Sequence, residues 1–192
     1  HLFTEMPDAP RRKIVPLLGH DILGPDLKDL ALNPSMLDFA EMIMDPYVQL
    51  DSYEISGFPI RHASHKGGSG RWHRDSFHLA DFYTAHYESV GRNHEVKYYT
   101  PPLACNCLIY LQDINEETGP FRMAPGSHLN SEIIAQSQVY EQHPEQRFLD
   151  LKAGDLVMLH HEVLHTGTWN TSNQYRYLIS NFVCRIGLPH RD

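Results

Sequence analysis

The residues best suited to binding a metal ion stand in two short histidine motifs. The first is His73-Arg74-Asp75, in which an imidazole and a carboxylate are two residues apart. Side chains at positions i and i+2 of a strand project from the same face, so this pair can grip one ion. Because the chain has 14 histidines, about one such pair is expected by chance, and residues 190–192 repeat the motif. The pair therefore needs a third ligand.

The second motif, His161-Glu162-Val163-Leu164-His165, spells the pattern of zinc metallopeptidases. On a helix its two histidines would bind zinc, and Glu162 would act as the general base. Two observations oppose this interpretation: residues 153–159 read as a turn followed by a strand, and no glutamate follows Glu162 to serve as a third ligand. A zinc metallopeptidase using His161-Glu162-x-x-His165 is the rival hypothesis, and it requires a helix at 160–166.

His165 also completes a different ligand set, together with His73 and Asp75 of the first motif. Two imidazoles and one carboxylate form the facial triad of non-haem iron(II) oxygenases, which leaves coordination positions open for a co-substrate and oxygen. A 2-oxo acid bound there needs a cation for its distal carboxylate. Arg176, at the start of an expected strand, can supply a planar bidentate partner.

Two polar residues near these motifs have structural as well as functional explanations. Arg176 could instead form an ion pair with Asp155 or Glu162. Asn106 lies within the apolar run 103–111, where a buried amide needs a hydrogen-bond partner. Backbone, water or the co-substrate could be that partner, and a co-substrate contact is the functional hypothesis for Asn106.

The elements that must position these residues are mostly short strands. Asn33-Pro34 predicts the start of a helix that ends at Asp45-Pro46, whereas residues 1–32 contain four prolines and are expected to be irregular. Residues 77–99 are rich in aromatic side chains without a clear period, and we expect them in the core or lining the substrate. Apolar, β-prone runs predict strands at residues 47–55, 103–111, 155–160 and 175–186. This pattern favours a β-sandwich or barrel.

Composition bounds the organisation of the chain and its partners. With 192 residues, 41% of them hydrophobic, the chain suits a single domain spanning 1–192. A net charge of -8 disfavours nucleic acid as a partner, and no apolar run reaches the ~20 residues that a membrane span needs. Three cysteines do not make a disulfide framework. We therefore expect buried thiols and a cytoplasmic protein.

Three blocks of the sequence resemble one known family. Residues 108–128, which read LIYLQDINEETGPFRMAPGSH, look like the central signature of the phytanoyl-CoA dioxygenase family. Residues 72–75, WHRD, resemble the first metal motif of that family, and residues 165–176 resemble its closing motif. The blocks occur in the family's order and together span more than half of the chain.

The resemblance implies a mainly β fold, with a double-stranded β-helix (jelly-roll, cupin-like) core and a few flanking helices. It implies an Fe(II) enzyme that uses 2-oxoglutarate and O₂ as co-substrates. Such an enzyme hydroxylates an unactivated C–H bond of a small organic substrate and releases succinate and CO₂. By position, His73, Asp75 and His165 would bind iron, and Arg176 would hold the C5 carboxylate of 2-oxoglutarate.

The sequence departs from the family pattern at two places. Gly167 stands where the family commonly has a small hydroxyl residue, so Thr166 or Thr168 would take over that contact, and Thr168 is our candidate. The family also usually has a segment before the point where this chain starts, so we expect a truncated or shortened N-terminus. Asp75, by contrast, keeps the carboxylate that halogenating relatives lack, which implies a hydroxylase.

Some questions stay open at the level of sequence. A jelly-roll domain that kept the fold but not the metal, and acts only in binding, is the second alternative to the oxygenase. The family acts on acyl-CoA, on amino-acid-derived solutes and on secondary metabolites, and no motif chooses among these substrates. The residues also do not indicate an oligomeric state.

Overall fold

A computed structural model describes residues 12–14, 25–44, 46–58, 70–75, 102–129 and 142–187, the first of these ranges as backbone only. The aromatic-rich residues 77–99 and the second His-Arg-Asp motif at 190–192 lie outside the described residues. In the described part of the chain, no helix combines the length and the apolar character needed to cross a membrane.

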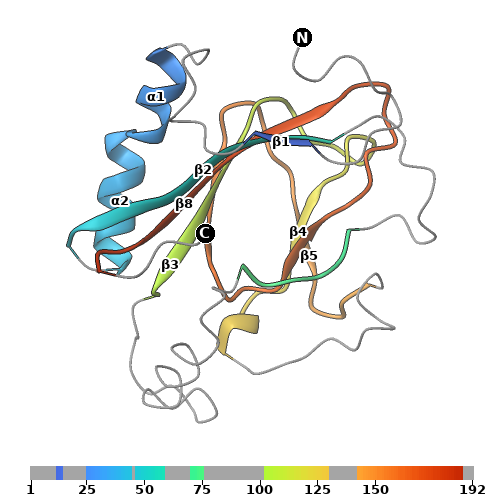
Figure 1. Cartoon of the computed structure of the whole chain (residues 1–192). Helices are drawn as coiled ribbons and strands as arrows, with labels where there is room; N and C mark the ends of the chain where they lie inside the picture. The colour runs from blue at the N-terminus through green and yellow to red at the C-terminus, as the bar shows by residue number, and fades with distance from the viewer. Residues whose placement is uncertain are drawn as a thin grey trace.

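The helices and strands are numbered in chain order (Figure 1). They are β1 (Arg12–Ile14), α1 (Pro25–Ala31), α2 (Pro34–Met44), β2 (Val48–Phe58), β3 (Ala104–Tyr110), β4 (Phe121–Met123), the 3-10 turn η2 (Ser127–Leu129), β5 (Arg147–Leu149), β6 (Leu156–His160), β7 (His165–Gly167) and β8 (Arg176–Arg185).

The strands form two antiparallel sheets that face each other (Figure 1). The large sheet has the order β1-β2-β8-β3-β6, and the small sheet has the order β5-β4-β7. Apolar side chains from both sheets, among them Leu108, Phe121 and Leu178, pack into one cluster between them. The two sheets thus enclose a barrel core, which confirms the mainly β, jelly-roll fold predicted from the sequence.

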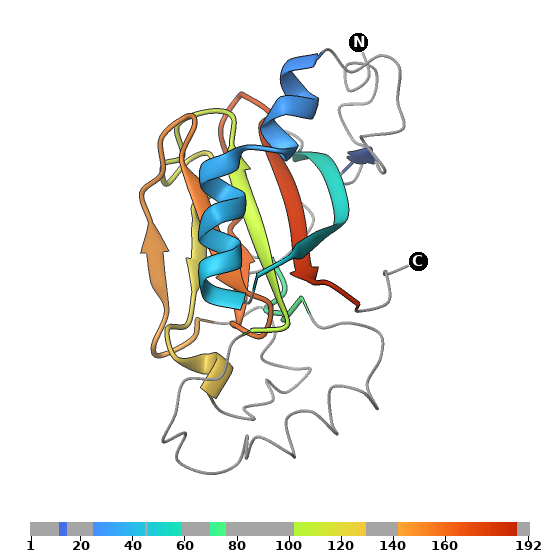
Figure 2. The same ribbon diagram turned by 90° about the vertical axis from the view of Figure 1, so that its left-hand side faces the viewer.

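The helices α1 and α2 cover the outer side of the large sheet, as the two views show (Figures 1 and 2). Asn33 caps α2, because its Oδ1 accepts a hydrogen bond from the Met36 N–H at 3.1 Å. Met36, Ala40 and Met44 recur every four residues and are buried against the sheet. The helix predicted after Asn33-Pro34 is therefore confirmed.

The segment before α2 is less irregular than expected. We expected residues 1–32 to be irregular, yet the short helix α1 occupies residues 25–31. Pro25 begins this helix, because a proline in the first turn lacks only an N–H that has no partner within the helix. The hydroxyl of Tyr53 in β2 donates to the carbonyl oxygen of Leu27 and holds the helix against the sheet.

The four predicted strands correspond to β2, β3, β6 and β8. Four further strands, β1, β4, β5 and β7, have three residues each and were not predicted. Such short strands do not extend over enough residues to show an alternating pattern. β7 matters most for the function, because it carries His165.

Side chains of β3 alternate between the helix layer and the barrel interior. Cys105 and Cys107 face α2, whereas Leu108 and Tyr110 face the interior. Both cysteines are free thiols, and burial raises the pKa of each to about 12. The expectation of buried thiols is thus confirmed for this pair.

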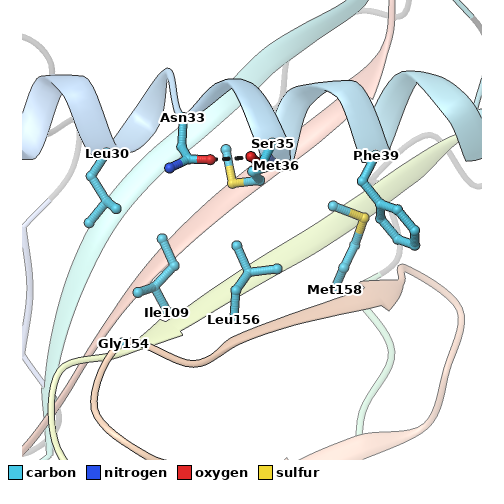
Figure 3. A pocket seen from close by; sticks show the side chains of 9 residues that line it. All are labelled: Leu30, Asn33, Ser35, Met36, Phe39, Ile109, Gly154, Leu156 and Met158. Carbon is cyan, nitrogen blue, oxygen red and sulfur yellow. Dashed lines mark hydrogen bonds between the residues drawn. The ribbon is translucent and has the colours of Figure 1, made fainter.

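A groove of about 420 Å³ lies between the helices and the large sheet (Figure 3). Met36 and Phe39 of α2 line one side, and Ile109 of β3 with Leu156 and Met158 of β6 line the other. Because Ile109 points to the helix side of β3, this groove is separate from the barrel interior.

Candidate metal centre

Residues 70–75 extend the small sheet beyond β7. His73 and His165 form an antiparallel bridge, in which each backbone N–H donates to the other residue's carbonyl, at 3.1 and 3.0 Å. The Asp75 N–H donates to the carbonyl of His161 at 2.8 Å. Gly70 packs so closely on β7 that a Cβ there would lie 2.6 Å from Thr166 Oγ1. Backbone contacts therefore bring the two histidine motifs together.

The side chains of His73, Asp75 and His165 converge at the end of this bridge. One ligand atom from each residue lies within 4.8 Å of the others. His73 Nε2 is 3.8 Å from Asp75 Oδ1, and His165 Nε2 is 3.5 Å from Asp75 Oδ2. The three residues singled out from the sequence thus form one cluster with the donor set of a facial triad.

Both imidazoles are oriented by the backbone. His73 Nδ1 lies 2.8 Å from the carbonyl oxygen of Arg71, and His165 Nδ1 lies 2.9 Å from that of Val163. A carbonyl can only accept, so each Nδ1 carries a proton and donates it. The Nε2 lone pairs of the neutral rings are then directed at the shared point, which is the usual arrangement of metal-binding histidines.

The cluster is buried on one side and open on the other. The side chain of His165 is 5% exposed and that of Asp75 16% exposed, whereas that of His73 is 48% exposed. The rings of His73 and His165 pack together, with centroids 4.4 Å apart. A ligand can therefore approach from the side of His73, while His165 is held by the barrel.

Asn106 on β3 contacts this cluster directly. Its Nδ2 donates to Asp75 Oδ2 at 2.7 Å, and its Oδ1 accepts from the hydroxyl of Ser180 on β8, also at 2.7 Å. The sequence predicted a buried amide in need of a partner, and the structure supplies two protein partners. Sequence reasoning missed Ser180, although the period-two spacing of Arg176, Leu178 and Ser180 on β8 could have placed it on the interior face.

Arg176 begins β8 and is buried in the barrel. Its guanidinium donates to the carbonyls of Thr118, Gly119 and Thr168 and lies over the ring of Phe58 at 4.3 Å. Burial raises the pKa of Tyr110 to about 12, and the positive charge of Arg176 opposes this rise. A buried cation is therefore present inside the barrel, and Arg176 begins the last strand, as expected from the sequence.

The carboxylates proposed as alternative partners of Arg176 have contacts of their own. Asp155 accepts a hydrogen bond from the Lys152 N–H at 2.7 Å, and Glu162 Oε1 lies 3.8 Å from His161 Nε2.

The residues after His165 pack closely around Arg176. A Cβ on Gly167 would lie 3.1 Å from the Nη2 atom of Arg176, so the missing side chain makes room for the guanidinium. The hydroxyl of Thr168 donates to the carbonyl of Pro120 at 2.9 Å, and its own carbonyl accepts from Arg176. Thr168 therefore borders the cation through its backbone.

The helix required by the zinc metallopeptidase hypothesis is not formed. β6 ends at His160, residues 161–164 form a turn, and β7 begins at His165. His161 is fully buried, and its Nδ1 lies 2.9 Å from the carbonyl of Ala104. His161 and His165 consequently do not share a helical face, and this alternative is wrong.

Two histidines and one aspartate that converge beside a jelly-roll barrel have the donor set of the facial triad of non-haem iron enzymes. The family model described as Phytanoyl-CoA dioxygenase (PhyH) matches residues 20–178. The chain belongs to the phytanoyl-CoA dioxygenase family. A search of curated protein sequences finds no match.

Several solved structures share the fold. HygX from Streptomyces hygroscopicus, with nickel, 2-oxoglutarate and hygromycin B bound, superposes with a TM-score of 0.67 at 18% identity, covering 94% of this chain and 72% of that one. The epimerase SnoN, in complex with Fe3+, alpha ketoglutarate and nogalamycin RO, gives 0.65 at 18% identity, covering 95% and 66%. EvdMO1 gives 0.60 at 20% identity and covers 83% of this chain. This chain spans only 32% of the EvdMO1 chain.

Proposed function

We propose that this protein is an Fe(II)- and 2-oxoglutarate-dependent oxygenase that hydroxylates an unactivated C–H bond of a small organic substrate. In this reaction one atom of O₂ enters the substrate as a hydroxyl group and the other enters succinate, while 2-oxoglutarate loses CO₂. The observation that carries the proposal is the convergence of the Nε2 atoms of His73 and His165 on the carboxylate of Asp75.

The donor set fits the metal. Two neutral imidazoles and one carboxylate suit Fe(II) and leave other coordination positions for exogenous ligands. The carbonyls of Arg71 and Val163 fix each ring with Nε2 facing the shared point, so little rearrangement is needed for binding. His73, Asp75 and His165 would hold the ion, and the bound metal and 2-oxoglutarate would supply the oxidising chemistry.

Arg176 is the residue proposed to bind the distal carboxylate of 2-oxoglutarate. It lies on the same face of β8 as Ser180, four residues away, which corresponds to about 13 Å of strand. The apolar residues Leu178 and Leu108 lie in the barrel core near this span. A dicarboxylate with one end at the metal and the other at a buried guanidinium would be held at both ends and shielded from water.

Two features support a small organic substrate. HygX was solved with hygromycin B bound and SnoN in complex with nogalamycin RO, so proteins of this fold bind organic molecules of this kind. In this chain the exposed edge of His73 gives access to the cluster. SnoN is an epimerase, so hydroxylation has to be distinguished from epimerisation by experiment. Labelled oxygen makes this distinction, because a hydroxylase transfers 18O from O₂ to its product and an epimerase does not.

The test begins with anaerobic addition of Fe(II) and then 2-oxoglutarate to the whole chain. We expect the weak visible charge-transfer band of the chelate, its loss in His73→Ala and its weakening in Arg176→Ala. His128→Ala, which removes an imidazole outside the cluster, serves as the matched control and should retain the band. On admission of O₂, the wild type should convert 2-oxoglutarate to succinate. A wild type that binds no Fe(II) would overturn the proposal and favour a metal-free binding domain.

A further inference from the structure

Three polar side chains form a continuous line from the large sheet to the metal centre. The hydroxyl of Ser180 on β8 donates to Asn106 Oδ1 on β3, and Asn106 Nδ2 donates to Asp75 Oδ2, with both distances 2.7 Å. Asp75 itself lies on the separate segment 70–75. The line therefore joins the paired strands β3 and β8 to the carboxylate of the cluster.

Chemistry fixes the direction of each hydrogen bond in this line. An ionised carboxylate can only accept, so the NH₂ group of Asn106 must face Asp75. The amide oxygen then faces Ser180, and an amide oxygen can only accept, so the serine hydroxyl must donate. The carboxylate of Asp75 thus selects the direction of the amide, and Ser180 holds the far end of the amide with a second hydrogen bond.

The hydrogen bonds of Asn106 and Ser180 lie in an apolar part of the core, where polar side chains give the fold no advantage in stability over apolar ones. Asn106 and Ser180 are both buried, and their neighbours on the interior face, Leu108 and Leu178, belong to the apolar barrel core. A buried amide is tolerated only when its groups are hydrogen-bonded, and an apolar pair of the same shape would be nearly neutral for stability. The arrangement is thus better explained by what it does to Asp75.

We propose that Asn106, anchored by Ser180, is a positioning residue that holds Asp75 in the orientation that completes the metal centre. This inference rests on the proposed function, because it assigns a role at the same site. The amide secures Oδ2 of Asp75 from the side of the sheet, while the backbone N–H of Asp75 is bound to His161. Side chain and backbone of the aspartate are then both fixed before a metal arrives.

The test measures Co(II) binding, followed by the visible absorption of the bound ion, which reports the coordination geometry. Asn106→Leu keeps the approximate volume and removes both hydrogen bonds. We expect it to weaken Co(II) affinity by about 10- to 100-fold, the range for partners that orient metal ligands, and to alter the spectrum. Ser180→Ala should change both in the same direction by less, and Ser180→Thr, which keeps the hydroxyl, should restore them.

The order of action supplies a second readout. If Ser180 acts only through Asn106, then Asn106→Leu combined with Ser180→Ala should bind Co(II) no more weakly than Asn106→Leu alone. Additive losses of Co(II) affinity would contradict the proposal that Ser180 acts through Asn106. Because Ser180→Ala makes a small cavity only, it keeps the test valid even where Asn106→Leu folds poorly.

Asn181→Leu is the matched control. Asn181 is a buried amide next to Ser180, but it faces the helix layer, where its Nδ2 donates to Met36 Sδ at 3.4 Å. We expect this variant to change the thermal midpoint and to leave Co(II) affinity and spectrum at wild-type values. Wild-type Co(II) binding in Asn106→Leu would overturn the positioning role of Asn106 and leave the proposed function intact. A wild-type protein that binds no Co(II) would overturn the proposed function itself.

Discussion

The two faces of β3 and β8 do different work with the same backbone. Toward the helices, these strands present apolar side chains such as Cys107, Ile179 and Val183, which pack on α1 and α2. Toward the barrel they present Asn106, Ser180 and Arg176, whose polar groups serve the metal centre and the buried cation pocket. The helix-facing side therefore packs the sheet against α1 and α2, and the barrel-facing side carries the polar groups of the candidate site.

The burial of individual residues does not reveal this difference between the two faces. Every residue of β3 is buried, so the strand shows none of the alternation of buried and exposed residues that marks a half-exposed sheet. Within β3 a single buried amide, Asn106, distinguishes the interior face from the helix-facing side.

The largest effect is expected at the barrel mouth. Asp75→Ala removes the only anionic member of the cluster, and we expect metal affinity to fall by more than the ~100-fold typical of residues that merely orient a ligand. Calorimetric titration with Fe(II) under argon measures the loss. Because Asn106 Nδ2 also loses its acceptor, the free energy of unfolding without metal should fall by about 1–3 kcal/mol, the cost of one unpaired buried donor, and a larger loss would contradict the separation of the two faces.

The next effect concerns the helix-facing side. Ile179 is fully buried beside Ala31, Tyr53 and Ile109, so Ile179→Ala should lower the free energy of unfolding by about 2–5 kcal/mol. Urea unfolding followed by circular dichroism measures the change. The folded fraction should bind Fe(II) with wild-type affinity, and weakened binding would show that the two faces are coupled.

A smaller effect is expected for Arg176→Lys, which keeps the charge and loses the planar arrangement of donors. Three carbonyl oxygens accept from the guanidinium, and an ammonium on a flexible stem cannot match that geometry. We expect the affinity for 2-oxoglutarate to fall by about tenfold, equivalent to ~1.5 kcal/mol for a charged hydrogen bond. Equilibrium dialysis measures it, with metal affinity as the internal control. Unchanged 2-oxoglutarate affinity would contradict a contact between Arg176 and the co-substrate.

The smallest effect lies at the junction of α2 with β2. Tyr47 has a φ of 71° and is 71% exposed, a conformation that is strained for a bulky residue and natural for glycine. Tyr47→Gly should stabilise the fold by roughly 0.5 kcal/mol, the strain relieved being partly offset by added flexibility of the unfolded chain. Tyr47→Ala retains the Cβ and should not stabilise. Chemical denaturation of both variants decides the matter, and equal stabilities would mean that the φ angle carries no cost.

The sequence was most informative where residue type alone indicates chemistry. His73, Asp75 and His165 could be grouped because imidazole and carboxylate are metal ligands in any fold, and the structure brings them together. Arg176 was expected at the start of the last strand, and it begins β8. The long strands and α2 were predicted because their apolar patterns extend over many residues.

Contacts that cross between segments could not be predicted. One partner of Asn106 is a carboxylate 31 residues away, on a segment that pairs with β7 through the bridge of His73 and His165, and no local pattern encodes that contact. β7 itself is too short for a periodic signal. Pro25 was expected to interrupt helical structure, but it begins α1. A proline can do either, because it disrupts the interior of a helix and is tolerated in its first turn.

The bridge between His73 and His165 also sets the order of events during synthesis. Its two halves are about ninety residues apart in the sequence, so the loop between them must close before the ligands can meet. During translation, His73 leaves the ribosome long before β7 and β8 exist to receive it. Until His165 has been synthesised, only His73 and Asp75 of the cluster are available to an ion. A metal could therefore contribute its full binding energy to folding only after both halves of the bridge have come together.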